Sequence, residues 1–275
     1  MSLLLVLFLA VLQGIAEFLP ISSSAHLRIG EAVFGFGDTP VLFDVMLHIG
    51  TLVAVVLVYR VLVLRTLRAA VRGIGRPSAA YREDPDFRLA CHVVLAMIPT
   101  VILAVALRKL SATWSSNLVL IGLTLLVTAS VLFALGLKIK RRAGVPGRPL
   151  AAMTWRDALA IGTAQGLSAT FRGLSRSGST ITTGVYAGLD QEAAAAFSFL
   201  VSIPAVLGAL VFLLKDYDGN SAVIGYGLVG AVISGIIGWF ALRWLLVWLG
   251  KGRLNLFAGW AAAVGVFAIV WSVAH

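Results

Sequence analysis

The stretch Gln13–His26, QGIAEFLPISSSAH, decides how the rest of the chain is interpreted. It follows an apolar run, yet it carries an amide, a carboxylate, several hydroxyls and an imidazole. A charged side chain at the centre of a membrane helix costs about 2.5–3.5 kcal/mol on insertion scales, so such a residue suggests function. A second stretch, Gln165–Thr180 (QGLSATFRGLSRSGST), also begins with Gln-Gly and also reaches a serine cluster. We interpret the chain as two halves, each of which brings one stretch to a common site.

The composition indicates an integral membrane protein. The 275 residues are 60% hydrophobic and only 12% charged, whereas soluble domains have about 25% charged residues. The basic residues that give the net charge of +10 gather between apolar runs, which favours loops beside anionic lipid over a nucleic-acid surface. We expect no cleavable signal peptide, because Leu3–Leu12 lacks a basic leader. A single cysteine, Cys91, excludes intramolecular disulfides.

The apolar arms around each polar stretch are too short to cross a bilayer, which needs about 20 apolar residues. We expect each to form a re-entrant helix pair, because a broken backbone at membrane depth must be enclosed by protein or a water-filled cavity. We predict two basic loops, Arg60–Arg88 and Lys138–Arg156, and a short turn before Leu118. A third basic segment, with Arg243, Lys251 and Arg253, is expected between the last two spans. The six predicted spans are Val41–Tyr59, Leu89–Leu107 (kinked at Pro99), Leu118–Leu137, Ala193–Leu214, Ala222–Leu242 and Leu254–Ala274.

The positive-inside rule favours both long basic loops in the cytoplasm. If the polar stretches do not cross, the third basic loop is also cytoplasmic and both termini lie outside. Each half then holds one re-entrant pair and three spans, and an odd number of spans makes the halves inverted. The predicted fold class is an all-α polytopic membrane protein with one domain, whose inverted halves cover about 1–140 and 157–275.

The first polar stretch offers oxygen ligands and hydroxyls. Gln13 and Glu17 are four residues apart and share a helix face, which suits a hard divalent cation or, alternatively, hydrogen bonding between helices. We expect Pro20 to end this helix. The hydroxyls of Ser22, Ser23 and Ser24 lie in the turn beyond it and can donate hydrogen bonds to phosphate oxygens. His26 can act as general base or nucleophile near neutral pH.

The second stretch offers cations and a glycine-flanked turn. Arg176 provides a bidentate fork for phosphate, and Arg172 adds a second cation nearby. We expect one of Ser177, Ser179 or Thr180 to cap the next helix. Each feature alone has an ordinary structural use, but together the two stretches hold the groups that phosphoryl transfer needs. His48 and Asp44, one turn apart on a span, are interpreted as a structural pair, outside the predicted site.

At these residues the chain resembles the bacterial undecaprenyl-diphosphatase family, also known for bacitracin resistance. The family's first motif is Glu/Gln-x-x-x-Glu, then Phe-Leu-Pro-x-Ser-Ser and a His; its second is Pro-Gly-x-Ser-Arg-Ser-x-x-Thr. The matching residues here are Gln13, Glu17, Phe18, Leu19, Pro20, Ser22, Ser23 and His26, and then Gly173, Ser175, Arg176, Ser177 and Thr180.

The resemblance implies a hydrolase of the bacterial plasma membrane. It implies removal of the terminal phosphate of undecaprenyl diphosphate, which recycles the lipid carrier of peptidoglycan synthesis, with a divalent cation (Mg²⁺ or Ca²⁺) and a site reached from the outer face. It leaves open the prenyl chain length and the oligomeric state, a homo-oligomer included. It implies Glu17 and Gln13 at the metal, Ser23 or His26 as nucleophile, and Arg176 on phosphate. The implied phosphate-binding residues are Ser22, Ser24, Gly173, Ser175, Ser177 and Thr180.

The chain departs from the family pattern at two positions. Gln13 stands where many members have Glu, and Arg172 stands where the family has Pro. Two other functions remain open. A transporter or lipid-carrier flippase would share the inverted-repeat design. A lipid phosphatase of the acid-phosphatase type would need a second His after its Ser-Arg, and none follows Arg176 before His275.

Overall fold

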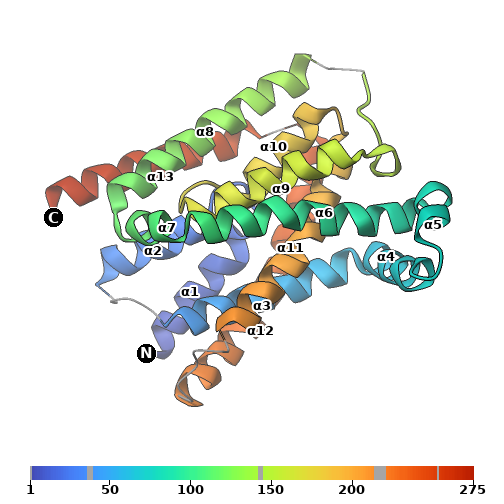
Figure 1. Cartoon of the computed structure of the whole chain (residues 1–275). Helices are drawn as coiled ribbons and strands as arrows, with labels where there is room; N and C mark the ends of the chain where they lie inside the picture. The colour runs from blue at the N-terminus through green and yellow to red at the C-terminus, as the bar shows by residue number, and fades with distance from the viewer. Residues whose placement is uncertain (1, 36–39, 142–144, 214–220, 253) are drawn as a thin grey trace.

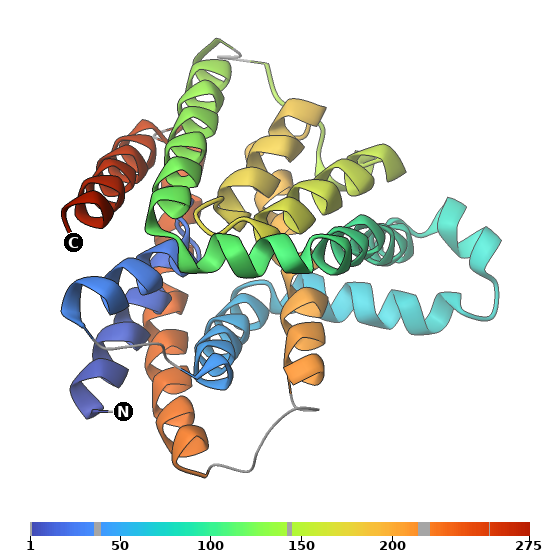
Figure 2. The same cartoon turned by 60° about the vertical axis from the view of Figure 1, so that its left-hand side comes forward.

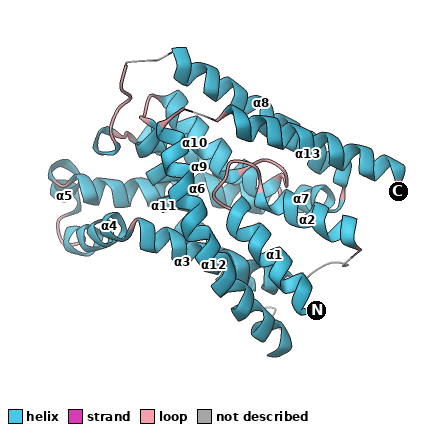
Figure 3. Cartoon of the chain, turned by 180° about the vertical axis from the view of Figure 1, so that it is seen from behind, coloured by secondary structure: helices cyan, strands magenta, loops and turns pink. Residues whose placement is uncertain are grey.

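The computed structural model describes residues 2–35, 40–141, 145–213, 221–252 and 254–275, and these fold into a bundle of α-helices (Figure 1). Short loops join the helices, and the described residues form no strand (Figure 3). Six of the described helices are long and apolar enough to cross a membrane, which confirms the predicted number. They are α3 (Val41–Val58), α6 (Pro85–Ala106), α8 (Leu118–Arg141), α11 (Gln191–Leu213), α12 (Ser221–Gly250) and α13 (Asn255–Ala274).

Each polar stretch joins two short helices, as the sequence predicted. The first pair is α1 (Leu3–Ala16) and α2 (Ser23–Phe34), and the second pair is α9 (Trp155–Thr170) and α10 (Arg176–Ala187). All four are shorter than the roughly 20 residues of a membrane span. The chain therefore changes direction at both polar stretches, inside the bundle.

Two expectations about the ends of these helices are wrong. Pro20 does not end α1, which stops at Ala16, and the turn that follows includes Ser22 with φ +69°. The N-cap of α10 is Ser175, whose hydroxyl accepts a bond from the backbone N–H of Gly178 (3.1 Å). A serine one position ahead of the helix satisfies the free N–H groups of the first turn, and serines within that turn do not.

Small residues set the spacing between the helices. Helix α12 lies between α1 and α3 (Figure 2), α6 packs along α9, and α8 packs along α13. A Cβ atom on Gly162 of α9 would lie 2.1 Å from the carbonyl oxygen of Ala96 on α6, and one on Gly122 of α8 would lie 2.7 Å from that of Gly265 on α13. Close packing of this kind replaces the hydrophobic driving force that membrane helices lack. The pairing of α1 with α12 and of α9 with α6 is the one that inverted halves would give, and the inversion itself stays a prediction.

The segment Arg60–Arg88 is not a loop. It forms α4 (Arg60–Gly73) and α5 (Pro77–Glu83), which lie at one end of the bundle (Figure 1), and α6 already begins at Pro85. One face of α4 is buried against α6, where Gly73 meets the ring of Phe87, and Arg65 forms a two-pronged ion pair with Asp86 (2.9 and 3.1 Å). The high arginine content hid this helix, because the arginines are exposed and only a narrow face of the helix is buried.

Three further expectations differ from the structure. Arg243 lies inside α12, where its guanidinium covers the ring of Trp239 (4.7 Å), so the helix continues past it. The turn expected before Leu118 is a helix, α7 (Arg108–Ser116), and Lys138–Arg156 contains the end of α8, a short 3-10 turn and the start of α9. Pro99 lies inside α6, as expected, and the kink expected there stays a prediction. Arg142, Leu214 and Arg253 lie outside the described residues.

Candidate active site

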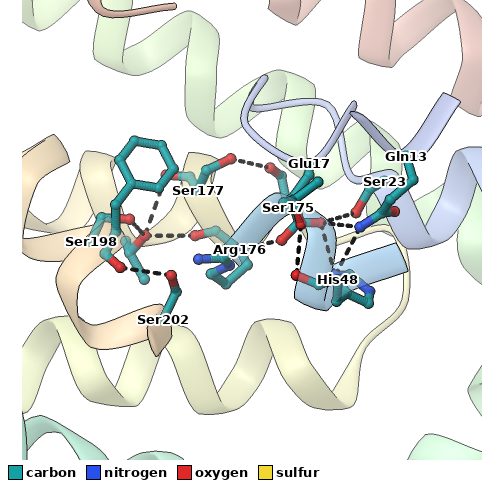
Figure 4. A network of polar contacts seen from close by, with 12 residues as sticks. Gln13, Glu17, Ser23, His48, Ser175, Arg176, Ser177, Ser198 and Ser202 are labelled. Carbon is teal, nitrogen blue, oxygen red and sulfur yellow. Dashed lines mark hydrogen bonds and ion pairs between the residues drawn. The ribbon is translucent and has the colours of Figure 1, made fainter. Parts of the chain in front are cut away.

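The carboxylate of Glu17 joins the two polar stretches (Figure 4). Its Oε2 accepts hydrogen bonds from Gln13 Nε2 (2.9 Å) and from Ser23 Oγ (2.7 Å), and its Oε1 forms an ion pair with Arg176. The side chain of Glu17 is only 6% exposed. A buried carboxylate needs paired donors of this kind to remain ionised. The two stretches therefore meet at one point, as the sequence analysis predicted.

Helix ends bring the side chains of Glu17, Ser23 and Arg176 together. Glu17 caps the end of α1, and its backbone N–H bonds to the Gln13 carbonyl (2.9 Å). Ser23 is the first residue of α2, and Arg176 is the first residue of α10. The carboxylate thus lies beside the N-termini of two helices, where the helix dipole stabilises negative charge. The same ends can bind phosphate oxygens.

His48 is a site residue that the sequence analysis missed. Its Nδ1 lies 2.8 Å from Gln13 Nε2 and 3.2 Å from Glu17 Oε2, so it belongs to the carboxylate's surroundings. The two N–H groups of the Gln13 amide can serve Glu17 and His48 at once. The signal was present, because an imidazole within an apolar span carries the same cost that drew attention to Glu17. His48 was left outside the predicted site because it was interpreted as the structural partner of Asp44.

His26 has both ring nitrogens engaged away from the carboxylate. Its Nδ1–H donates to the Ser22 carbonyl (2.8 Å), and its Nε2 accepts from Trp260 Nε1–H (2.9 Å), with the two rings nearly parallel at 9°. This tautomer follows from its partners, since the indole N–H can only donate and the carbonyl can only accept. His26 does not line the cavity that holds Glu17. No sequence pattern pointed to Trp260, which lies on α13.

A cavity of about 390 Å³ opens beside Glu17. This size is within the range of small-molecule sites. One part of its wall is apolar and comes from α3 and α11: Val45, Ala205, Val206 and Ala209. The polar part includes Glu17, Ser22, Ser23, Ser24, His48, Arg172, Ser175, Arg176 and Ser177. The cavity therefore suits an amphiphile with an anionic head group.

Two of the predicted phosphate-binding residues do not line this cavity. Gly173 has φ +102° and packs on α8, where its carbonyl accepts a bond from Thr128 Oγ1 (2.8 Å). Thr180 is buried, donates to the Arg176 carbonyl (2.7 Å) and bonds to Ser198. Both residues shape the loop and the helix that carry Arg176. Ser22, Ser24, Ser175 and Ser177 do line the cavity.

The site has buried polar atoms without a partner. Arg176 Nη1 and Gln13 Oε1 are both buried and form no hydrogen bond. An unpaired buried donor or acceptor costs about 1–3 kcal/mol, so these atoms are suited to a ligand. Arg176 Nη1 can take an anion oxygen, and Gln13 Oε1 can take a cation.

Glu17 and Gln13 fit a divalent cation when a substrate adds its own oxygens. Glu17 is the one carboxylate that lines the cavity, and within the described ranges no group of three or more His, Cys, Asp and Glu residues is placed to hold a metal ion. Mg²⁺ is commonly bound by one or two carboxylates together with substrate phosphates and water. Glu17 and the unpaired Gln13 Oε1 meet that pattern.

Comparisons with known proteins agree on one family. The sequence model described as "Bacitracin resistance protein BacA" matches residues 6–267. An undecaprenyl-diphosphatase of Desulfatibacillum aliphaticivorans is 36% identical over 96% of this chain and 97% of its own length. Proteins of the same name from Nocardioides sp. (37% identical, 96% and 94% covered) and Methanobrevibacter smithii (34%, 100% and 99%) are similar throughout. The chain therefore belongs to the bacitracin resistance protein family.

Proposed function

We propose that this chain hydrolyses undecaprenyl diphosphate to undecaprenyl phosphate and inorganic phosphate. This activity recycles the lipid carrier of cell-wall synthesis and confers resistance to bacitracin. The observation that carries the proposal is the hydrogen bond from the Ser23 hydroxyl to Glu17, in a cavity that also holds Arg176. A nucleophile, a base and an anion-binding cation thus share one wall. The names of the relatives support the choice of substrate.

Ser23 is the nucleophile of the proposed mechanism. Its Oγ attacks the terminal phosphorus as its proton passes to Glu17 Oε2, which lies 2.7 Å away. The bond from that phosphorus to the bridging oxygen breaks, and Glu17 returns the proton to the departing lipid phosphate. Glu17 then takes a proton from water, which attacks the phosphorus of the phosphoserine. The bond from that phosphorus to Ser23 Oγ breaks, inorganic phosphate leaves, and Glu17 returns the proton to Ser23 Oγ. Ser23 is preferred to His26 because both nitrogens of His26 are already bonded elsewhere.

The remaining groups stabilise the charge on the transferred phosphoryl group. Arg176 Nη1, buried and unpaired, is available to its oxygens, and the first turns of α2 and α10 supply backbone N–H groups. A divalent cation, Mg²⁺ or Ca²⁺, bound by Glu17 and Gln13 together with phosphate oxygens, would neutralise further negative charge. Gln13 holds the Glu17 carboxylate in position through one amide N–H, and its other N–H donates to His48 beside it.

The apolar wall of the cavity accounts for the lipid part of the substrate. Val45 on α3 and Ala205, Val206 and Ala209 on α11 face the same cavity as the polar groups. An isoprenoid chain can follow this wall into the membrane while its diphosphate stays beside Glu17. We place the site at the outer face of the plasma membrane, in line with the topology from the positive-inside rule.

Phosphate release by the purified protein tests this proposal. The substrate is undecaprenyl diphosphate in detergent, with and without EDTA, and the variants are Ser23→Ala and the control Ser130→Ala, whose hydroxyl lies on the exposed side of α8. We expect release by the wild type and by Ser130→Ala, its loss with EDTA, and a reduction of at least about 100-fold in Ser23→Ala. A well-folded wild type that releases no phosphate would contradict the proposal and favour a transporter.

A further inference from the structure

Arg172 is a cation in the cavity wall that the mechanism above does not use. It lies in the loop between α9 and α10, its side chain is half-buried, and it lines the same cavity as Glu17. Within the part of the chain that the structure describes, its guanidinium has no hydrogen bond or ion pair. Arg148 and Arg176, by contrast, are paired with carboxylates. A guanidinium with five donors, partly removed from water and unpaired, is suited to an incoming anion.

The backbone on both sides of Arg172 is fixed. Its carbonyl accepts a hydrogen bond from Thr124 on α8, and the ring of the preceding Phe171 packs edge-on against Trp114 of α7, with centroids 4.9 Å apart. The next residue, Gly173, has φ +102°, and a Cβ atom there would lie 2.1 Å from Thr124 Oγ1. Packing on two helices therefore holds the base of the side chain in place. Such preorganisation lowers the entropy lost when a ligand binds.

The charges of the cavity wall leave Arg172 uncompensated. The charged groups of this wall are Glu17, Arg172 and Arg176, beside the imidazole of His48. Glu17 and Arg176 form an ion pair with each other, so Arg172 supplies the net positive charge. A diphosphate has negative charge on both phosphates, and Arg176 Nη1 can serve only the one beside Ser23.

We propose that Arg172 binds the second phosphate of the diphosphate, the one that stays on the lipid. This inference rests on the proposed function. The hydroxyl-bearing residues Ser111 and Ser115 of α7 line the same cavity and complete the polar surroundings of this phosphate. When the bond to the terminal phosphorus breaks, negative charge moves onto the lipid phosphate, and Arg172 stabilises it there. Arg172 is then the residue by which this chain distinguishes a diphosphate from a single phosphate.

Direct binding of inorganic anions tests the subsite without the lipid. Binding of inorganic pyrophosphate and of inorganic phosphate is measured on purified protein by equilibrium dialysis with ³²P label. The variants are Arg172→Gln, Arg172→Lys and Arg156→Gln, the last a control at the exposed, opposite end of α9, where the guanidinium lies over Trp155 (5.3 Å). Size-exclusion elution and thermal melting establish that each variant is folded.

We expect Arg172→Gln to weaken pyrophosphate binding about 10- to 100-fold, the range of a charged hydrogen bond, and phosphate binding by less than about threefold. Arg172→Lys, which keeps the charge and loses the fork, should fall between Gln and wild type, and Arg156→Gln should match wild type. Unchanged pyrophosphate binding, or an equal loss for both anions, would overturn the inference. Binding does not require turnover, so this result is independent of whether the chain hydrolyses the lipid.

Discussion

Glu17 has four polar neighbours, and they come from four different helices or helix ends: Gln13, Ser23, His48 and Arg176. Three of the four were predicted from the sequence, because polar residues within apolar runs stand out. The contact of His26 with Trp260 could not be predicted, since the two residues are 234 positions apart and Trp260 lies outside both polar stretches. Sequence thus identified which residues are costly to bury, and the structure supplied their partners.

The amide of Gln13 should bind a divalent cation more weakly than a carboxylate at the same position would. Replacing it, Gln13→Glu, adds a second carboxylate beside Glu17 and should lower the Mg²⁺ concentration for half-maximal phosphate release by about tenfold, because affinity rises with the ligands' charge. A Mg²⁺ titration of activity measures this, with Gln191→Glu, away from this cavity, as the control. An unchanged half-saturation point would count against Gln13 as a ligand.

The hydrogen bond between Trp260 and His26 is proposed to be structural. Trp260→Phe keeps a ring beside the imidazole and removes the N–H donor, so we expect a loss of about 0.5–1.5 kcal/mol in stability and retention of activity. Thermal melting and phosphate release measure the two effects. Trp271→Phe, at the far end of α13, is the control. Inactivation as complete as that of Ser23→Ala would instead indicate a catalytic His26.

At the scale of elements, the number of membrane-spanning helices was predictable and helix boundaries were not. Apolar runs of sufficient length gave all six spans, because a bilayer imposes that length. Helix α4 was missed because its sequence is basic and its buried face is small, with Val63, Thr66, Ala69 and Gly73. The end of α1 was misplaced because Pro20 was the visible breaker, whereas Glu17 and its ion pair lie where the helix stops.

The crossing of α6 and α9 depends on Gly162. A methyl group there would lie 2.1 Å from the carbonyl oxygen of Ala96, so Gly162→Ala must separate the helices and should destabilise the protein by about 1–3 kcal/mol. Gly259→Ala is the matched control, because a Cβ atom there meets nothing within 4 Å, and it should be neutral or stabilising by up to about 1 kcal/mol. Thermal melting in detergent compares them. Equal melting temperatures would contradict the packing described for α6 and α9.

At the scale of the whole molecule, membership of the bacitracin resistance protein family and a multi-pass membrane fold agree with the sequence analysis. The inverted halves and the orientation in the membrane stay predictions. They were inferred from the distribution of basic residues and from the repeated Gln-Gly stretches. The helix bundle by itself has no marker of inside and outside.

Labelling with a membrane-impermeant maleimide tests the orientation. In a Cys91→Ala background, which removes the single native thiol, exposed positions are converted one at a time: Ser2→Cys, Arg82→Cys and Lys251→Cys. The positive-inside rule predicts that Ser2→Cys is labelled in intact spheroplasts and that the other two are labelled only after permeabilisation. Labelling of Lys251→Cys in intact spheroplasts would contradict the non-crossing path of the polar stretches.

The central claim is that the two polar stretches form one site through Glu17 and Arg176, and a double-mutant cycle tests it most directly. Phosphate release from undecaprenyl diphosphate is measured for wild type, Glu17→Gln, Arg176→Gln and the double variant, all shown to be folded. Residues that act as a unit are strongly non-additive. We predict that each single variant releases phosphate at least about 100-fold more slowly than wild type. The rate of the double variant should lie within about threefold of the rate of the slower single variant. Losses that multiply in the double variant would show that the two residues act independently and would contradict the claim.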